Sequence, residues 1–184
     1  MCWLIIKPKF KRLDPRWVAV LCTLLSSTSH AATTESAVKA GFIYNFTKFV
    51  EWPASAGVYA GFNICVIGDN RLENSLQAIE GKQAHGKPIH LHMGVKPLNL
   101  KSCQIVFLAE DDNRKLRYIL KALSNAPALT VSDSPGFVQL GGMIGLVRDE
   151  AHLAFEINLS SVKTAGLHVN AQLLKLAKNI KRLK

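Results

Sequence analysis

One internal segment restricts the fold of this chain more than any other. Residues 104–109 read QIVFLA, a short run that places apolar side chains on both faces of a strand. Such a strand needs cover on both sides, which is typical of a parallel sheet between two layers of helices. A helical period follows over residues 112–125, and a further strand-like run occupies residues 128–132. We therefore predict two parallel strands joined by a crossover helix.

The same alternation occurs on either side of this unit. Residues 35–50 have helical spacing and precede Trp52-Pro53, which ends the helix because the residue before proline avoids the α region. A strand, a helix and a strand follow over residues 62–67, 72–79 and 89–93. Later, residues 143–147 and 153–157 flank a turn and predict an antiparallel hairpin. The fold class is therefore α/β: a three-layer sandwich with a mostly parallel sheet plus a C-terminal antiparallel hairpin.

The C-terminal residues predict one last helix. Asn170 is a suitable N-cap, and the apolar residues after it fall on one stripe. The stripe consists of Leu173, Leu176, Ala177, Ile180 and Leu183. Five basic residues, Lys175, Lys178, Lys181, Arg182 and Lys184, would lie around the other faces of this helix. Such a basic face is usually solvated, and beside a membrane it would also meet anionic headgroups or an acidic partner.

The first residues are typical of a secretory signal peptide. Five basic residues and one acid precede an apolar stretch over residues 17–25, which is too short to cross a bilayer. Small and polar residues follow, and Ser29 and Ala31 match the small-x-small cleavage pattern. We place cleavage after Ala31, so that residues 1–31 are removed and residues 32–184 form a single domain in the periplasm.

Removal of the signal peptide changes the charge of the chain. The net charge falls from +10 to +6, and five of the remaining basic residues lie in the last ten positions. The body of the domain is then nearly neutral, whereas nucleic-acid binding requires a basic stripe across the body. We therefore expect no nucleic-acid partner.

Two of the four cysteines, Cys65 and Cys103, remain in the mature chain. In an oxidising compartment a pair of cysteines suggests one disulfide. Two buried free thiols are the alternative.

Acidic residues follow three predicted strands: Asp69, the triplet at 110–112, and Asp133. Acids that converge at the carboxyl edge of a sheet would hold a metal or accept a phosphate. The simpler interpretation is that Asp112 and Asn70 cap the helices that begin there. A phosphoacceptor site would also need a partner lysine, and the sequence indicates none.

Other candidate sites carry equally plain structural interpretations. His90 and His92 point to the same face of a strand, at a spacing that metals use, but no further ligand is identifiable nearby. Gly141-Gly142 leads into a strand rather than a helix, which indicates a bulge or a close approach to a neighbouring group. Ser132 and Ser134 have no identifiable base. We therefore expect no catalytic residues, no metal and no cofactor, and do not expect an enzyme.

Three residues are candidates for contact with a partner. Tyr44 and Trp52 fall off the main apolar stripe of their helix, where they either complete the core or form a docking patch. Glu156 lies between Phe155 and Ile157 on a predicted strand. It is either a plain surface residue or a carboxylate that contacts a ligand in a groove.

Several blocks of sequence form an ordered set over nearly all of the mature chain. The blocks are VKAGFIYNFTKFVEWP (38–53), FNICVIG (62–68), CQIVF (103–107), LTVSD (129–133), GGMI (141–144), FEIN (155–158), AGL (165–167) and LLKLA (173–177). Together they resemble the YfiR family.

This resemblance implies a periplasmic inhibitor that binds the sensory region of an inner-membrane diguanylate cyclase and thereby lowers cyclic-di-GMP and biofilm formation. It also implies an α/β sandwich that is often a homodimer, and an OmpA/Pal-like outer-membrane lipoprotein that sequesters the inhibitor. Cys65 and Cys103 match positions that form a disulfide in the family. A second disulfide in the later half of the family's best-known member has no counterpart here, which puts redox sensing by this chain in doubt.

Two other hypotheses belong to different classes. One is a periplasmic small-ligand binding module that serves another membrane receptor or transporter. The other is an enzyme whose strand-end acids, Asp69 and Asp112, act on a metal.

Overall fold

The computed structural model describes residues 30–56, 61–68, 72–96, 100, 102–150 and 152–182. The predicted signal peptide lies outside these residues, apart from positions 30 and 31. Among the described residues, no helix has both the length and the apolar character needed to cross a membrane.

The helices and strands are α2 (His30–Phe49), β1 (Val50–Glu51), a 3-10 turn (Ala54–Ala56), β2 (Phe62–Gly68), α3 (Glu73–Gln77), β3 (Gln83–Ala84), β4 (Lys87–Met93), β5 (Ile105–Ala109), α4 (Asn113–Leu123), β6 (Leu129–Ser132), β7 (Ile144–Asp149), β8 (His152–Asn158), α5 (Leu159–Thr164), β9 (His168–Val169), α6 (Ala171–Leu176) and β10 (Asn179–Lys181). The predicted helices and strands occur in the predicted order, and the structure adds the short elements β1, β3, α5, β9 and β10, which were not predicted.

One eight-stranded sheet forms the centre of the fold, with the strand order β10-β8-β7-β6-β5-β2-β4-β3. All neighbours in it are parallel except two pairs, β7 with β8 and β3 with β4. The hairpin of β7 and β8 is the predicted antiparallel one, with Leu146 opposite Phe155. The mostly parallel sheet and its hairpin confirm the predicted fold class.

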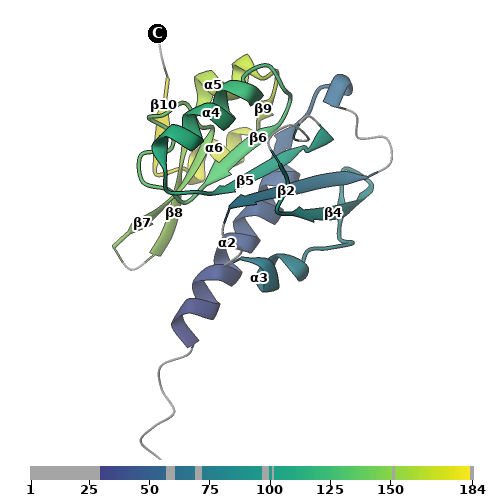
Figure 1. Ribbon diagram of the computed structural model, residues 1–184, viewed down its shortest axis with the longest axis vertical. Coiled ribbons are helices and arrows are strands. Elements are labelled where there is room, and N and C mark those ends of the chain that lie inside the picture. The colour runs from purple at the N-terminus through teal and green to yellow at the C-terminus, as the bar shows by residue number, and fades with distance from the viewer. Residues whose placement is uncertain are drawn as a thin grey trace, which may run out of the picture. The chain divides into compact units, whose positions relative to one another are not determined.

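Helices cover both faces of the sheet (Figure 1). On one face, Ile64 and Phe107 belong to the same core as Ile43 and Phe46 of α2 and Leu76 of α3. On the other face, a second core joins strand residues to the helix α4, and it includes Val106, Leu108, Leu116 and Ile119. Strand β5 contributes alternate side chains to both cores, so its uninterrupted apolar sequence is explained by burial on two faces.

The predicted C-terminal helix is wrong in its second half. Asn170 caps α6 as predicted, since its side chain accepts a hydrogen bond from the Gln172 N–H, but the helix ends at Leu176. The Lys178 N–H then donates to the carbonyl oxygen of Phe155, at 2.9 Å, and β10 continues alongside β8. The open edge of β8 offers backbone hydrogen bonds to this segment, and that pairing overrides its helical spacing. Leu176, which was expected to be buried, is 68% exposed.

The end of the first helix also differs slightly from the prediction. Helix α2 ends at Phe49, and Val50 and Glu51 pair with His168 and Val169 in a separate two-stranded antiparallel sheet. Local spacing did not reveal this pairing, because its partner lies more than a hundred residues away in the chain.

Candidate functional site

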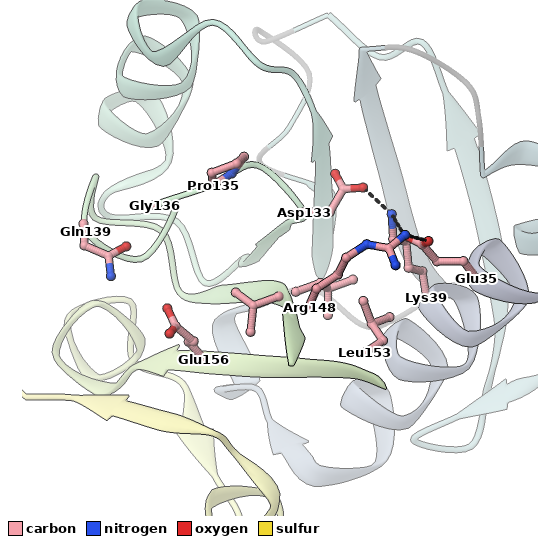
Figure 2. A pocket seen from close by; sticks show the side chains of 11 residues that line it. Glu35, Lys39, Asp133, Pro135, Gly136, Gln139, Arg148, Leu153 and Glu156 are labelled. Carbon is pink, nitrogen blue, oxygen red and sulfur yellow. Dashed lines mark hydrogen bonds and ion pairs between the residues drawn. The ribbon is translucent and has the colours of Figure 1, made fainter. Parts of the chain in front are cut away.

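A groove of about 550 Å³ lies between α2, the loop after β6, and the hairpin of β7 and β8 (Figure 2). Glu35 and Lys39 come from α2, Asp133 and Gln139 from the loop, and Arg148 and Glu156 from the hairpin. Apolar side chains of the hairpin complete the lining, namely Leu146, Val147 and Leu153. A volume of about 300–1,000 Å³ with a few polar groups is usual for sites that bind small molecules.

A chain of ion pairs closes one side of the groove. The Nζ of Lys39 lies 2.7 Å from an Asp133 carboxylate oxygen and 3.0 Å from a Glu35 carboxylate oxygen. The Arg148 guanidinium contacts the other oxygen of Glu35. Figure 2 shows these four side chains gathered together, with Glu156 standing apart on β8. This network joins α2 to two later segments, with a sequence separation of 94 residues between Lys39 and Asp133 and 113 between Glu35 and Arg148.

The charge of Lys39 is set by two opposing influences. Burial, the largest of them, lowers the pKa of Lys39, but hydrogen bonds and charge attraction from Asp133 and Glu35 together outweigh it and raise the pKa above its ordinary value. Lys39 is therefore a fixed positive charge at neutral pH. It is suited to holding the groove together and unsuited to acting as a base or nucleophile.

The loop that carries Asp133 is held by hydroxyl groups rather than by the acids. The Ser132 hydroxyl donates to the carbonyl oxygen of Leu108 at 2.6 Å and accepts from the Ser134 N–H. The Ser134 hydroxyl donates to the carbonyl oxygen of Glu110. Phe137, farther along the same loop, is buried in the second core. The two serines therefore position the loop through backbone contacts.

Glu156 lines the groove. This is the position required by the interpretation in which its carboxylate contacts a ligand, and that contact stays a prediction. Its carboxylate accepts a hydrogen bond of 2.8 Å from the side-chain amide of Asn179 on β10. No ion pair of Glu156 occurs among the described residues, so within them its negative charge is uncompensated, in contrast to the paired charges of Glu35 and Asp133. A cationic group in the groove would find its best partner at Glu156.

Tyr44 and Trp52 are both partly buried against the first core. The Trp52 indole N–H donates to the carbonyl oxygen of Gln104 at 3.0 Å, and its ring packs edge-on against Phe62. The Tyr44 ring lies beneath two ammonium groups, with the Nζ of Lys48 at 4.1 Å and that of Lys82 at 5.2 Å from its centroid. Tyr44 thus belongs to a small cationic surface, while most of the contacts of Trp52 are internal.

The strand-end acids divide into different roles. Asp112 caps α4, because its side chain accepts a hydrogen bond of 2.8 Å from the Arg114 N–H, and this bond lowers the pKa of Asp112. The pKa of Glu110 is lowered chiefly by the hydrogen bond from the Asp112 N–H, and also by Lys115. Asp133 is part of the groove. Asp69 and Asn70 lie outside the described residues.

Cys65 and Cys103 form a disulfide with their Cα atoms 5.9 Å apart. The predicted disulfide is therefore confirmed over the alternative of two buried free thiols. Both cysteines are buried in the second core. The bridge joins β2 to the residues immediately before β5, two strands that are already neighbours in the sheet.

His90 and His92 lie on the exposed side of β4. His90 contacts Glu80 at 3.5 Å, and His92 shares a hydrogen bond of 3.0 Å with the Asn63 side chain. In the described part of the chain, no three His, Cys, Asp or Glu side chains converge on one point as a metal site would require.

Gly142 makes the close approach that its sequence predicted. A Cβ atom at this position would lie 2.2 Å from the Phe137 ring, which is itself buried.

Sequence reasoning missed Glu35, Lys39 and Arg148. The sequence placed Lys39 only on a polar side of the predicted helix and Glu35 only at its first position, and it indicated no partner lysine for the strand-end acids. The i, i+4 spacing of Glu35 and Lys39 was a usable signal for an ion pair. Nothing in the sequence placed Asp133 or Arg148 beside them.

The fold and the groove define an α/β sandwich domain with a mixed-charge groove beside its antiparallel hairpin. A family model described as YfiR/HmsC-like matches residues 36–178, and the chain belongs to that family. This is a regulatory rather than a catalytic family, and its members are periplasmic regulators in the diguanylate cyclase pathway.

A solved structure resembles this chain in fold. A conserved domain protein from Vibrio cholerae O1 biovar El Tor strain N16961 matches with a TM-score of 0.52 and 13% identity, over 79% of this chain and 60% of that one. The chain thus spans less than two thirds of that protein. The ABC domain in complex with L-Trp from Streptococcus pneumoniae matches at a TM-score of 0.45 and 8% identity, over 68% of this chain and 56% of that one.

Proposed function

We propose that this chain binds the periplasmic sensory region of an inner-membrane diguanylate cyclase and inhibits it, which lowers cyclic-di-GMP and biofilm formation. The observation that carries this proposal is the family match over residues 36–178. The export that it requires is consistent with the signal-like sequence of residues 1–31, which we propose is cleaved near Ala31, leaving residues 32–184 as the working domain.

The mechanism needs only differential binding. An inhibitor that prefers the inactive conformation of the cyclase shifts the population toward that conformation by the ratio of its two affinities. A competitor for the inhibitor reverses the shift. We propose that an OmpA/Pal-like outer-membrane lipoprotein is that competitor and that the inhibitor is a homodimer.

Tyr44, Trp52 and Glu156 are our proposed contact residues for the cyclase or the lipoprotein. The two ammonium groups beside Tyr44 favour an acidic segment of a partner at that surface. The unpaired charge of Glu156 favours a basic group. Trp52 is rigidly held by its indole hydrogen bond, as an anchor residue at an interface is.

Deletion of the gene tests the proposal in cells. Cyclic-di-GMP and biofilm should rise, and they should return to the original level when the gene is restored. Unchanged cyclic-di-GMP in a strain whose cyclase is intact would refute the proposed inhibition.

Purified proteins test the contact residues. We expect Tyr44→Ala and Glu156→Gln to weaken binding to the periplasmic region of the cyclase by about tenfold each, the effect of losing roughly 1.4 kcal/mol. The control is Tyr118→Ala, since Tyr118 is 65% exposed on α4 and lies outside the proposed contacts. Trp52→Phe serves better than Trp52→Ala, because it keeps a ring in the core while removing the indole N–H.

The groove supports a second candidate function, the binding of a small ligand that is passed to another membrane receptor or transporter. Its volume and the uncompensated charge of Glu156 favour a small molecule with a cationic group. Copurification from the periplasm separates the two functions, because it captures a cyclase in one case and a transporter or another receptor in the other.

A further inference from the structure

The charge of the chain is distributed unevenly at its C-terminal end. No acidic residue occurs after Glu156, whereas six basic residues do, and five of them lie in the last ten positions. The family match ends at residue 178, so β10 lies beyond it. The family match therefore covers Lys175 and Lys178 of this basic end but not Lys181 and Arg182.

The fold exposes apolar side chains among these cations. Leu176 is 68% exposed and Ile180 is 36% exposed. Lys178 is paired with Asp149 at 2.8 Å, but within the described residues Lys175, Lys181 and Arg182 have no ion pair. We call the five residues Lys175, Leu176, Ile180, Lys181 and Arg182 the C-terminal basic surface.

The same segment forms an open edge of the sheet (Figure 1). Because the Lys178 N–H faces β8, and because successive residues of a strand alternate in direction, the backbone groups of Asn179 and Lys181 face away from the sheet. Because only these two residues offer free backbone groups there, an added strand would form few hydrogen bonds with this edge. A second copy of this chain at the edge would also place Lys181 and Arg182 of both copies close together, so repulsion disfavours that occupant.

We propose that the C-terminal basic surface binds an anionic phospholipid bilayer. Long basic side chains adapt to a fluid layer of headgroups without a shaped partner surface, and each one near an anionic leaflet strengthens binding by about fivefold. Exposed leucine and isoleucine side chains beside such cations enter the boundary between headgroups and acyl chains. The combination of unpaired cations, exposed apolar groups and a short strand edge fits a membrane surface better than a protein.

Vesicle binding tests the proposal with no other protein present, so the result is separate from the fate of the cyclase hypothesis. Protein purified from the periplasm is sedimented with vesicles of phosphatidylcholine alone, or of phosphatidylcholine with phosphatidylglycerol, at low and high salt. We expect binding only to the vesicles that contain phosphatidylglycerol, and weaker binding at high salt because the charges are screened.

Two double variants decide whether the position of the charge matters. Lys181→Glu with Arg182→Glu should reduce binding at least about tenfold. The control is Lys87→Glu with Lys96→Glu, which changes the net charge equally on and just after β4, toward the opposite edge of the sheet, and should have a much smaller effect. Leu176→Ser with Ile180→Ser should weaken binding while leaving its salt dependence unchanged.

Three outcomes would overturn the proposal. The first is equal binding to both vesicle types, and the second is an equal loss of binding in the two charge variants. The third is no vesicle binding at low salt. In that case binding of the cyclase region is measured next. If it binds the wild type but not the Lys181→Glu, Arg182→Glu variant, the surface would be assigned to an acidic protein partner instead.

Discussion

The ammonium of Lys39 on α2 lies 2.7 Å from a carboxylate oxygen of Asp133, a residue 94 positions later in the chain. This pair fixes the first helix to the carboxyl end of β6 and forms one wall of the groove. Because Lys39 also contacts Glu35, the loss of the lysine leaves Asp133 without its cation and leaves Glu35 with Arg148 alone.

We expect Lys39→Met to lower the free energy of unfolding by about 1–3 kcal/mol, because partly buried charged hydrogen bonds of this kind are costly to break from one side. Arg117→Met is the control, since Arg117 is exposed on α4, and it should change stability by less than about 0.5 kcal/mol. Urea denaturation measures both variants. Equal stability of the two would contradict the role given to Lys39.

The pH dependence of this pair follows from the raised pKa of Lys39. A group whose pKa is raised in the folded state stabilises the fold fully below its ordinary pKa, which is 10.5 for Lys39, and loses that contribution as the pH rises through the folded value. The difference in stability between the wild type and Lys39→Met should therefore be constant across the neutral range and shrink only above pH 10.5. Urea midpoints measured against pH test this, and a decline within the neutral range would contradict it.

The stability that the Asp112 cap of α4 contributes should depend on pH in the opposite direction. The pKa of Asp112 is lowered, so its charge contributes to stability above its ordinary pKa of 3.8, and the contribution is lost as the pH falls through the lower folded value. At neutral pH, Asp112→Ala should destabilise the protein more than Asp112→Asn does, because asparagine keeps the oxygen that accepts the Arg114 N–H. Thermal unfolding of the two variants at neutral and acidic pH is the measurement, and equal melting temperatures at neutral pH would remove the capping role.

Replacement of both cysteines by serine should lower the free energy of unfolding by up to about 4 kcal/mol, the chain-entropy value for a loop of this size. The bridged cysteines are 38 residues apart in the sequence. Urea denaturation of the double variant, and of the wild type with and without reductant, measures the effect. If the reduced wild type is as stable as the oxidised protein, the bridge has no part in stabilising the fold.

Two glycines should respond in opposite directions to the same substitution. Gly142→Ala would press a methyl group against the buried Phe137 ring and should cost about 1–3 kcal/mol. Gly41→Ala, in the middle of α2 where the added methyl group meets nothing within 4 Å, should stabilise the protein by about 0.5–1 kcal/mol. Melting temperatures of the two variants give the comparison, and a shift of the same sign in both would contradict the packing argument.

Much of the fold was predictable because its signals are local. The apolar run of β5 indicated burial on two faces, and both cores contain its side chains. The turn at Asp149 and Glu150 joins the predicted hairpin. Asp112 and Asn170 cap helices as their residue types indicated. The close approach at Gly142 was also predictable from the sequence, since glycine permits a contact that any side chain would block.

The sequence by itself therefore determined the order of the main helices and strands from α2 to β8, the α/β class and the family resemblance, since each depends on spacing within a short window. Only the tertiary structure decided the groove and the final strand. Lys39 and Glu35 contact Asp133 and Arg148 because α2 packs against segments about a hundred residues later in the chain. No local sequence pattern predicts which of these charges become neighbours. Residues 179–181 have helical spacing, yet they form a strand because the free edge of β8 supplies hydrogen bonds that a local reading cannot anticipate.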